Sequence, residues 1–77
     1  MRSPEDILAE LAEDTAHLSG LDTLALGARL QADGAKKLAD GDYPRGTYDI
    51  ARGVFLIVMG GAKMAEGRVE AAGREGA

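Results

Sequence analysis

The sequence predicts an all-α fold, a small three-helix domain in which the second and third helices form a close-packed antiparallel hairpin. Alanine is abundant, β-branched residues are few, and no segment alternates apolar with polar residues as a strand would. Apolar residues instead recur at helical spacing in three segments separated by glycine-containing breaks. The predicted helices span about residues 4–18, 22–40 and 44–66.

The first helix has a clear start signal. Ser3 is a suitable N-cap, Pro4 fits the first helical position, and Asp6 completes an acidic variant of the capping box. Gly20 is the predicted stop of this helix. One apolar stripe follows at helical spacing: Ile7, Leu8, Leu11, Thr15 and Leu18.

The other two helices are bounded by similar signals. Asp22 is the predicted cap of the second helix and Gly41 its terminator, and Pro44 begins the third. Residues 67–77 are polar and interrupted by glycines, so we expect a frayed or disordered C-terminal tail after a single domain over residues 1–66.

Glycines recur every seventh residue in both predicted hairpin helices. A glycine inside a helix costs about 1 kcal/mol relative to alanine, so this repeat requires a structural reason. If the two helices fold back around Asp42, facing residues have numbers that sum to 84, and every glycine of one helix faces a longer side chain of the other. The predicted pairs are Gly34–Ile50, Gly27–Ile57, Gly20–Met64, Leu38–Gly46, Gln31–Gly53 and Leu24–Gly60. A chance pattern in a chain rich in alanine and glycine is the alternative explanation.

The sequence "GDY" at residues 41–43, with small residues at Gly34, Gly46 and Gly53, resembles a tetratricopeptide-type helical hairpin over about residues 27–58. The resemblance implies a close helix crossing and a role in binding peptides or proteins. A lone repeat does not form the concave groove of such arrays. Three positions depart from the pattern, which prefers leucine, tyrosine and proline there: Asp33, Lys37 and Val58.

Size and charge restrict the functional classes. The chain has 77 residues, a net charge of −4, no cysteine and one histidine, so disulfides are excluded and oligomerisation is the remaining support for a small core. Acidic residues concentrate near the start, and basic residues form no stripe of the kind that nucleic acids require. No signal peptide is recognisable, and the longest apolar run, 53–62, is too short for a bilayer. We therefore expect a cytoplasmic protein with no membrane contact, and the alanine-, glycine- and arginine-rich composition suggests a bacterial or phage origin.

The third helix is apolar on more than the side that faces the second. We expect the first helix to pack on one of its remaining faces, and a second apolar patch to stay free for a partner. The alternatives are that the first helix shifts onto this patch, or that isolated apolar side chains are tolerated on the surface. The face expected to receive the first helix comprises Ala51, Val54, Phe55, Val58, Ala62 and Ala65. The candidate partner interface comprises Tyr48, Arg52, Leu56 and Met59.

No motif predicts catalysis or a cofactor. Residues 40–46 lack the ligand spacing of a calcium loop, and residues 53–63 lack the context of a phosphate loop. His17 lies near Glu13 and Asp14, a spacing that suits a metal or a general base, although a histidine also suits the end of a helix. We therefore predict a non-enzymatic protein-interaction or regulatory protein without cofactor or metal, acting as a homodimer or with another protein. Two alternatives remain: an enzyme or metal protein around His17, and a nucleic-acid-associated regulator using basic residues, namely Arg45, Arg52, Lys63 and Arg68.

Overall fold

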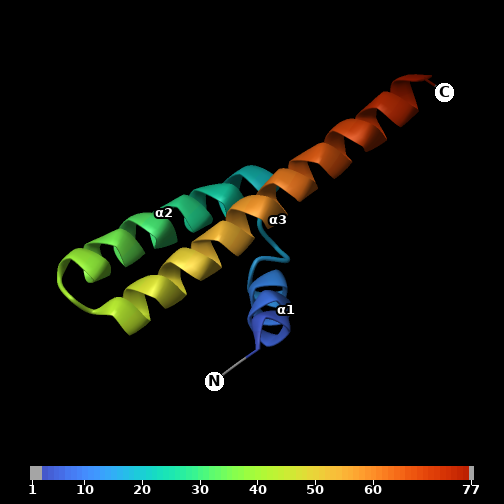
Figure 1. The fold of residues 1–77 in the computed structure, drawn as a ribbon. Helices are drawn as coiled ribbons and strands as arrows, with labels where there is room; N and C mark the ends of the chain where they lie inside the picture. The colour runs from blue at the N-terminus through green and yellow to red at the C-terminus, as the bar shows by residue number, and fades with distance from the viewer. Residues whose placement is uncertain (1–2, 77) are drawn as a thin grey trace.

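The computed structural model describes residues 3–76, and they form an all-α arrangement of three helices. These are α1 (Pro4–Asp14), α2 (Gly20–Ala39) and α3 (Tyr43–Gly76). In Figure 1, α2 and α3 lie side by side and antiparallel, α1 lies against one side of α3, and α3 extends well past the start of α2. The predicted fold class, with its close-packed helical hairpin, is confirmed.

The start of α1 follows its sequence signal, but its end does not. The Ser3 hydroxyl oxygen accepts a hydrogen bond from the Asp6 amide at 3.2 Å, so the predicted cap is confirmed. The helix ends at Asp14, four residues before the predicted end at residue 18. The Thr15 hydroxyl donates to the Leu11 carbonyl oxygen at 2.7 Å, and the chain then turns toward α2.

The second helix begins earlier than predicted and has a different cap. The Ser19 hydroxyl oxygen accepts a hydrogen bond from the Asp22 amide at 3.0 Å, so Ser19 is the cap and the assignment of Asp22 was wrong. Gly20 is the first residue of α2 and does not stop the preceding helix. This correction matters for packing, because a helical Gly20 can take part in the contact between α2 and α3.

A tight turn joins the hairpin helices. Gly41 has φ +90°, a left-handed conformation that glycine adopts without strain. Its amide donates to Leu38 at 3.0 Å, and the Asp42 amide donates to Lys37 at 2.8 Å, which together form a Schellman motif. The Asp42 side chain then accepts from the Arg45 amide at 3.4 Å, in the first turn of α3.

The third helix is longer than predicted, because it continues to Gly76 and not only to residue 66. Residues 1, 2 and 77, which belong to the predicted domain and tail, lie outside the described part of the chain.

The core is small and is contributed by all three helices. Leu11 of α1 and Leu56 of α3 are its buried apolar side chains, and Thr15 and Thr23 are enclosed with them. Among the described residues no buried side-chain nitrogen or oxygen lacks a hydrogen-bond partner. Because so little apolar area is enclosed, the contact between α2 and α3 contributes much of the stability of the fold.

Candidate protein-interaction surface

The hairpin seam brings the backbones of α2 and α3 into contact. A Cβ atom built on Gly27 would lie 2.6 Å from the Gly53 carbonyl oxygen, and one built on Gly53 would lie 2.6 Å from the Gly27 carbonyl oxygen. The same reciprocal approach joins two further glycine pairs, Gly20–Gly60 and Gly34–Gly46. Each glycine thus presents its Cα hydrogens to a carbonyl of the other helix, a weak attractive contact that any side chain would prevent.

The longer side chains of the seam lie against the same glycines. A Cβ atom built on Gly27 would lie 3.0 Å from Cγ1 of Ile57, and one built on Gly60 would lie 2.9 Å from Cβ of Leu24. The structure brings together all six pairs that the register predicts. Gln31, the one polar member, presents its Cγ methylene to Gly53 at 2.7 Å from a built Cβ and stays half-buried, so its amide group need not enter the seam.

Lys63 joins all three helices at one corner. Its ammonium group donates to the carbonyl oxygens of Thr15 at 2.8 Å and Leu18 at 3.3 Å, and to the Thr23 hydroxyl at 3.2 Å. An ammonium has three donors, so these three acceptors satisfy it completely. Its positive charge also lies beside the C-cap of α1, Thr15, where a helix is electronegative. This corner determines which face of α3 is covered by α1.

The first helix covers only part of the α3 face on which it was predicted to pack. Ala51 and Phe55 of that face are half-buried and line a groove with Pro4 and Ile7 of α1. The other predicted members are exposed, namely Val54, Val58, Ala62 and Ala65. Leu56 shares a face of α3 with Lys63, seven residues later, and is 0% exposed. Leu56 cannot belong to an exposed partner interface, and its placement there was wrong. Met59 is half-buried beside it, so the candidate interface of the sequence prediction is not a free apolar patch.

The remaining members of that predicted interface take part in a polar chain within the molecule. Asp49, whose side chain is only 9% exposed, accepts a hydrogen bond from Lys37 of α2. Arg52 lies 3.6 Å from the other Asp49 oxygen, and its guanidinium carbon is 5.3 Å from the centre of the Tyr48 ring. These contacts link α2 to α3 next to the seam, and they occupy the charged groups with one another.

The apolar surface left open lies on the opposite side of the hairpin. Val54 and Val58 of α3 are 44% and 65% exposed, and Leu21 of α2 is 64% exposed. At 100° per residue these valines point away from the face that carries Leu56 and Lys63. We call this surface the uncovered face. By helical position, the exposed residues on this side of the seam are Leu21, Ala25, Ala28, Ala32, Ala35 and Ala39 of α2 and Thr47, Val54, Val58, Gly61, Ala62 and Ala65 of α3, and none of them is charged.

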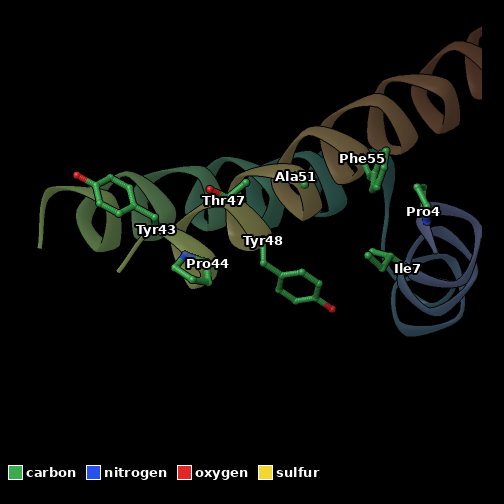
Figure 2. Close-up of a pocket in the computed structure, with 8 residues that line it drawn as sticks. All are labelled: Pro4, Ile7, Tyr43, Pro44, Thr47, Tyr48, Ala51 and Phe55. Atoms are coloured by element: carbon green, nitrogen blue, oxygen red, sulfur yellow. The ribbon is translucent and has the colours of Figure 1, made fainter. Parts of the chain in front are cut away.

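An apolar groove of about 740 Å³ adjoins this face where α1 begins and α3 starts. Figure 2 shows the side chains of Tyr48 and Phe55 on α3, with Pro4 and Ile7 of α1 beside them. The lining has no charged side chain. Its remaining members all come from the first turns of α3: Tyr43, Pro44, Thr47 and Ala51.

Comparison of the chain with protein-family models, with curated proteins and with solved structures finds no match. The hairpin is therefore interpreted from its own contacts and not from a relationship to tetratricopeptide proteins.

The alternative sites from the sequence are placed as follows. His17 is exposed in the turn after α1, and no group of three or more potential metal ligands is found among the described residues. Within the same part of the chain, no helix is long and apolar enough to cross a bilayer. Of the basic residues considered for nucleic acid, Lys63 and Arg52 have the partners given above, Arg45 lies 3.6 Å from Asp42, and Arg68 is exposed.

Sequence reasoning missed the α2 half of the uncovered face. The signal was present, because Ala25, Ala28, Ala32, Ala35 and Ala39 recur at intervals of three and four residues. Alanine is too small to stand out in a pattern of large apolar residues. The α3 half was identified as apolar but was assigned to the first helix.

Proposed function

We propose that this chain is a small non-enzymatic protein-interaction domain, with a regulatory or adaptor role, and that it binds through the uncovered face of its hairpin. The observation that carries the proposal is the position of Val54 and Val58, well exposed on a face of two helices that has no charged residue. Contiguous apolar surface of this kind usually marks a site of protein interaction.

The small residues of the face support a helical partner. Alanine side chains allow the backbone of another helix to approach closely, in the way that glycines already allow within the hairpin. The valines and Leu21 supply the larger side chains that such a contact buries.

The arrangement of charges favours a protein partner over nucleic acid. Lys63 is held by three acceptors, and Arg52 lies between Asp49 and the Tyr48 ring. Binding to nucleic acid depends on lysine and arginine side chains that can contact phosphates. Lys63 and Arg52 already bind groups within this chain.

A photo-crosslinking experiment in the cells that produce the chain tests this proposal. We would place benzoylphenylalanine at Val58, on the uncovered face, and at Ala12, an exposed residue of α1, as the matched control. The expected result is a protein adduct from Val58 that is missing from Ala12. Ala28, also on the uncovered face, is a second position for the crosslinker. If neither Val58 nor Ala28 forms an adduct, the proposed function is contradicted.

A further inference from the structure

We propose that the partner at the uncovered face is a second copy of this chain, related by a two-fold axis parallel to the hairpin helices. In this arrangement α2 of each copy lies over α3 of the other, and all neighbouring helices are antiparallel. The inference rests on the proposed function, because it names the occupant of the same face.

The first support is that one side of the hairpin lacks a covering element. The molecule measures 55 × 22 × 15 Å along its principal axes, so the three helices form an elongated arrangement. A helix pair generally buries its apolar face against another element. In this chain α1 covers part of one side of the hairpin, and nothing in residues 3–76 covers the other side.

The second support is the amount of surface left exposed. The accessible surface is 5418 Å². A folded monomer of 8.0 kDa is expected to expose about 4,450 Å², so the excess is roughly 1,000 Å². Part of this excess belongs to the end of α3 beyond α2, so the uncovered face accounts for less than the whole of it. An interface of standard size buries roughly 800 Å² of each partner, which is of the same order.

The third support is the match of side-chain sizes at equal heights along the hairpin. The seam contacts place Leu24 beside Gly60 and Ile57 beside Gly27, and these pairs define which residues of α2 and α3 share a height. A two-fold axis along the helices preserves height, so Leu21 of one copy meets Gly61 and Ala62 of the other. By the same relation, Val58 meets Ala25 and Ala28, and Val54 meets Ala28 and Ala32. Larger residues therefore oppose small ones throughout the contact.

The absence of charge on the face removes the usual obstacle to self-association. In a symmetric dimer the same patch is used by both copies, so any charge near the axis would meet a like charge. No residue of the uncovered face is charged, and the positive side chains of Arg29 and Lys36 lie on the outer side of α2.

The test is the solution mass of the full chain, by light scattering and sedimentation equilibrium over a wide concentration range. We compare the natural chain with Ala32→Lys, on the uncovered face, and with Ala12→Lys, which makes the same change on an exposed position of α1. The natural chain and Ala12→Lys are expected to dimerise. Ala32→Lys should dimerise at least about 100-fold more weakly, because a charge would be buried without a partner. Val58→Lys is a second variant on the face, and circular dichroism verifies that each variant keeps its helix content.

The outcomes separate this inference from the proposed function. A natural chain that stays monomeric at every concentration overturns the second copy as partner, while a Val58 adduct with a protein of another mass still supports the interaction domain. A dimer that neither face variant weakens overturns the assignment of this face.

The orientation has its own measurement. The chain has no cysteine, so Asp40→Cys provides one spin-label site per copy, at the hairpin turn. A parallel two-fold axis places both turns at the same end and predicts a short distance between the labels. Labels separated by about 30 Å or more, the length of a 20-residue helix, would overturn this arrangement.

Discussion

The ammonium nitrogen of Lys63 in α3 lies 2.8 Å from the carbonyl oxygen of Thr15, just after α1, and so joins two residues 48 positions apart. The same nitrogen binds the Leu18 carbonyl and the Thr23 hydroxyl, where α1 ends and α2 begins. This contact attaches α1 to the hairpin on the side of Leu56 and leaves the other side open.

Replacing Lys63 with methionine should loosen α1. The variant keeps an apolar side chain of similar length but leaves the Thr15 and Leu18 carbonyls without this donor. We expect the free energy of unfolding to fall by about 1–3 kcal/mol in urea titrations. Lys36→Met, on the exposed side of α2, is the control and should change it by less than about 0.5 kcal/mol. Equal effects of the two changes would contradict the role of Lys63.

Adding one methyl group should have opposite effects at two glycines. In Gly27→Ala the new Cβ would lie 2.6 Å from a backbone oxygen that cannot move without separating the helices. We expect a loss of about 1–3 kcal/mol or more in unfolding free energy. Gly67 has open space around it, so Gly67→Ala should add up to about 1 kcal/mol of helix stability. Thermal denaturation followed by circular dichroism measures both, and two changes of the same sign would show that the seam is not closely packed.

Removing Lys37 should lower the free energy of unfolding, because the carboxylate of Asp49 then loses its lysine partner. The Asp49 side chain is 9% exposed and that of Lys37 42%, so water can reach the lysine more readily than the carboxylate. Lys37→Met should therefore destabilise the fold by about 1–3 kcal/mol, and adding Asp49→Leu should restore part of that loss. A double-mutant cycle in urea measures the coupling, which would be absent if the two groups acted independently. Arg45→Met, at an exposed pair, should change stability by less than about 1 kcal/mol.

The rate of amide hydrogen exchange in α3 should be low before Met64 and high after it. Up to this residue the helix packs against α2, and Gly20 lies beside Met64 at the end of the seam. Beyond it, Gly67 and Gly73 contact nothing within 4 Å of a built Cβ, so opening there costs little. We expect slow exchange at Gly53 and fast exchange from Gly67 onward, measured by NMR. Uniform protection along α3 would rule against the frayed tail that the sequence predicts.

The hairpin could be predicted in detail because its information is local and repeated. A helical glycine has a known cost, and its repetition at every seventh residue has meaning only if a second helix uses the space. That condition predicts Gly27 opposite Ile57 and Gly53 opposite Gln31, and both contacts are present in the structure. The helix ends were less predictable, because Ser19 and Asp22 are both good caps and only the path of the chain selects between them.

The sequence by itself determined the helical class, the seam and its register, because each depends on residue types at fixed spacings along one or two helices. Only the tertiary structure decided which side of α3 is covered by α1. Two faces of α3 are apolar, one with Leu56 and the other with Val54 and Val58, and their hydrophobicity alone does not distinguish them. The choice follows from Lys63, whose ammonium binds carbonyls of the turn directly after α1. That contact joins residues far apart in the chain, so no local sequence pattern predicts it. The position of the uncovered face follows from this contact.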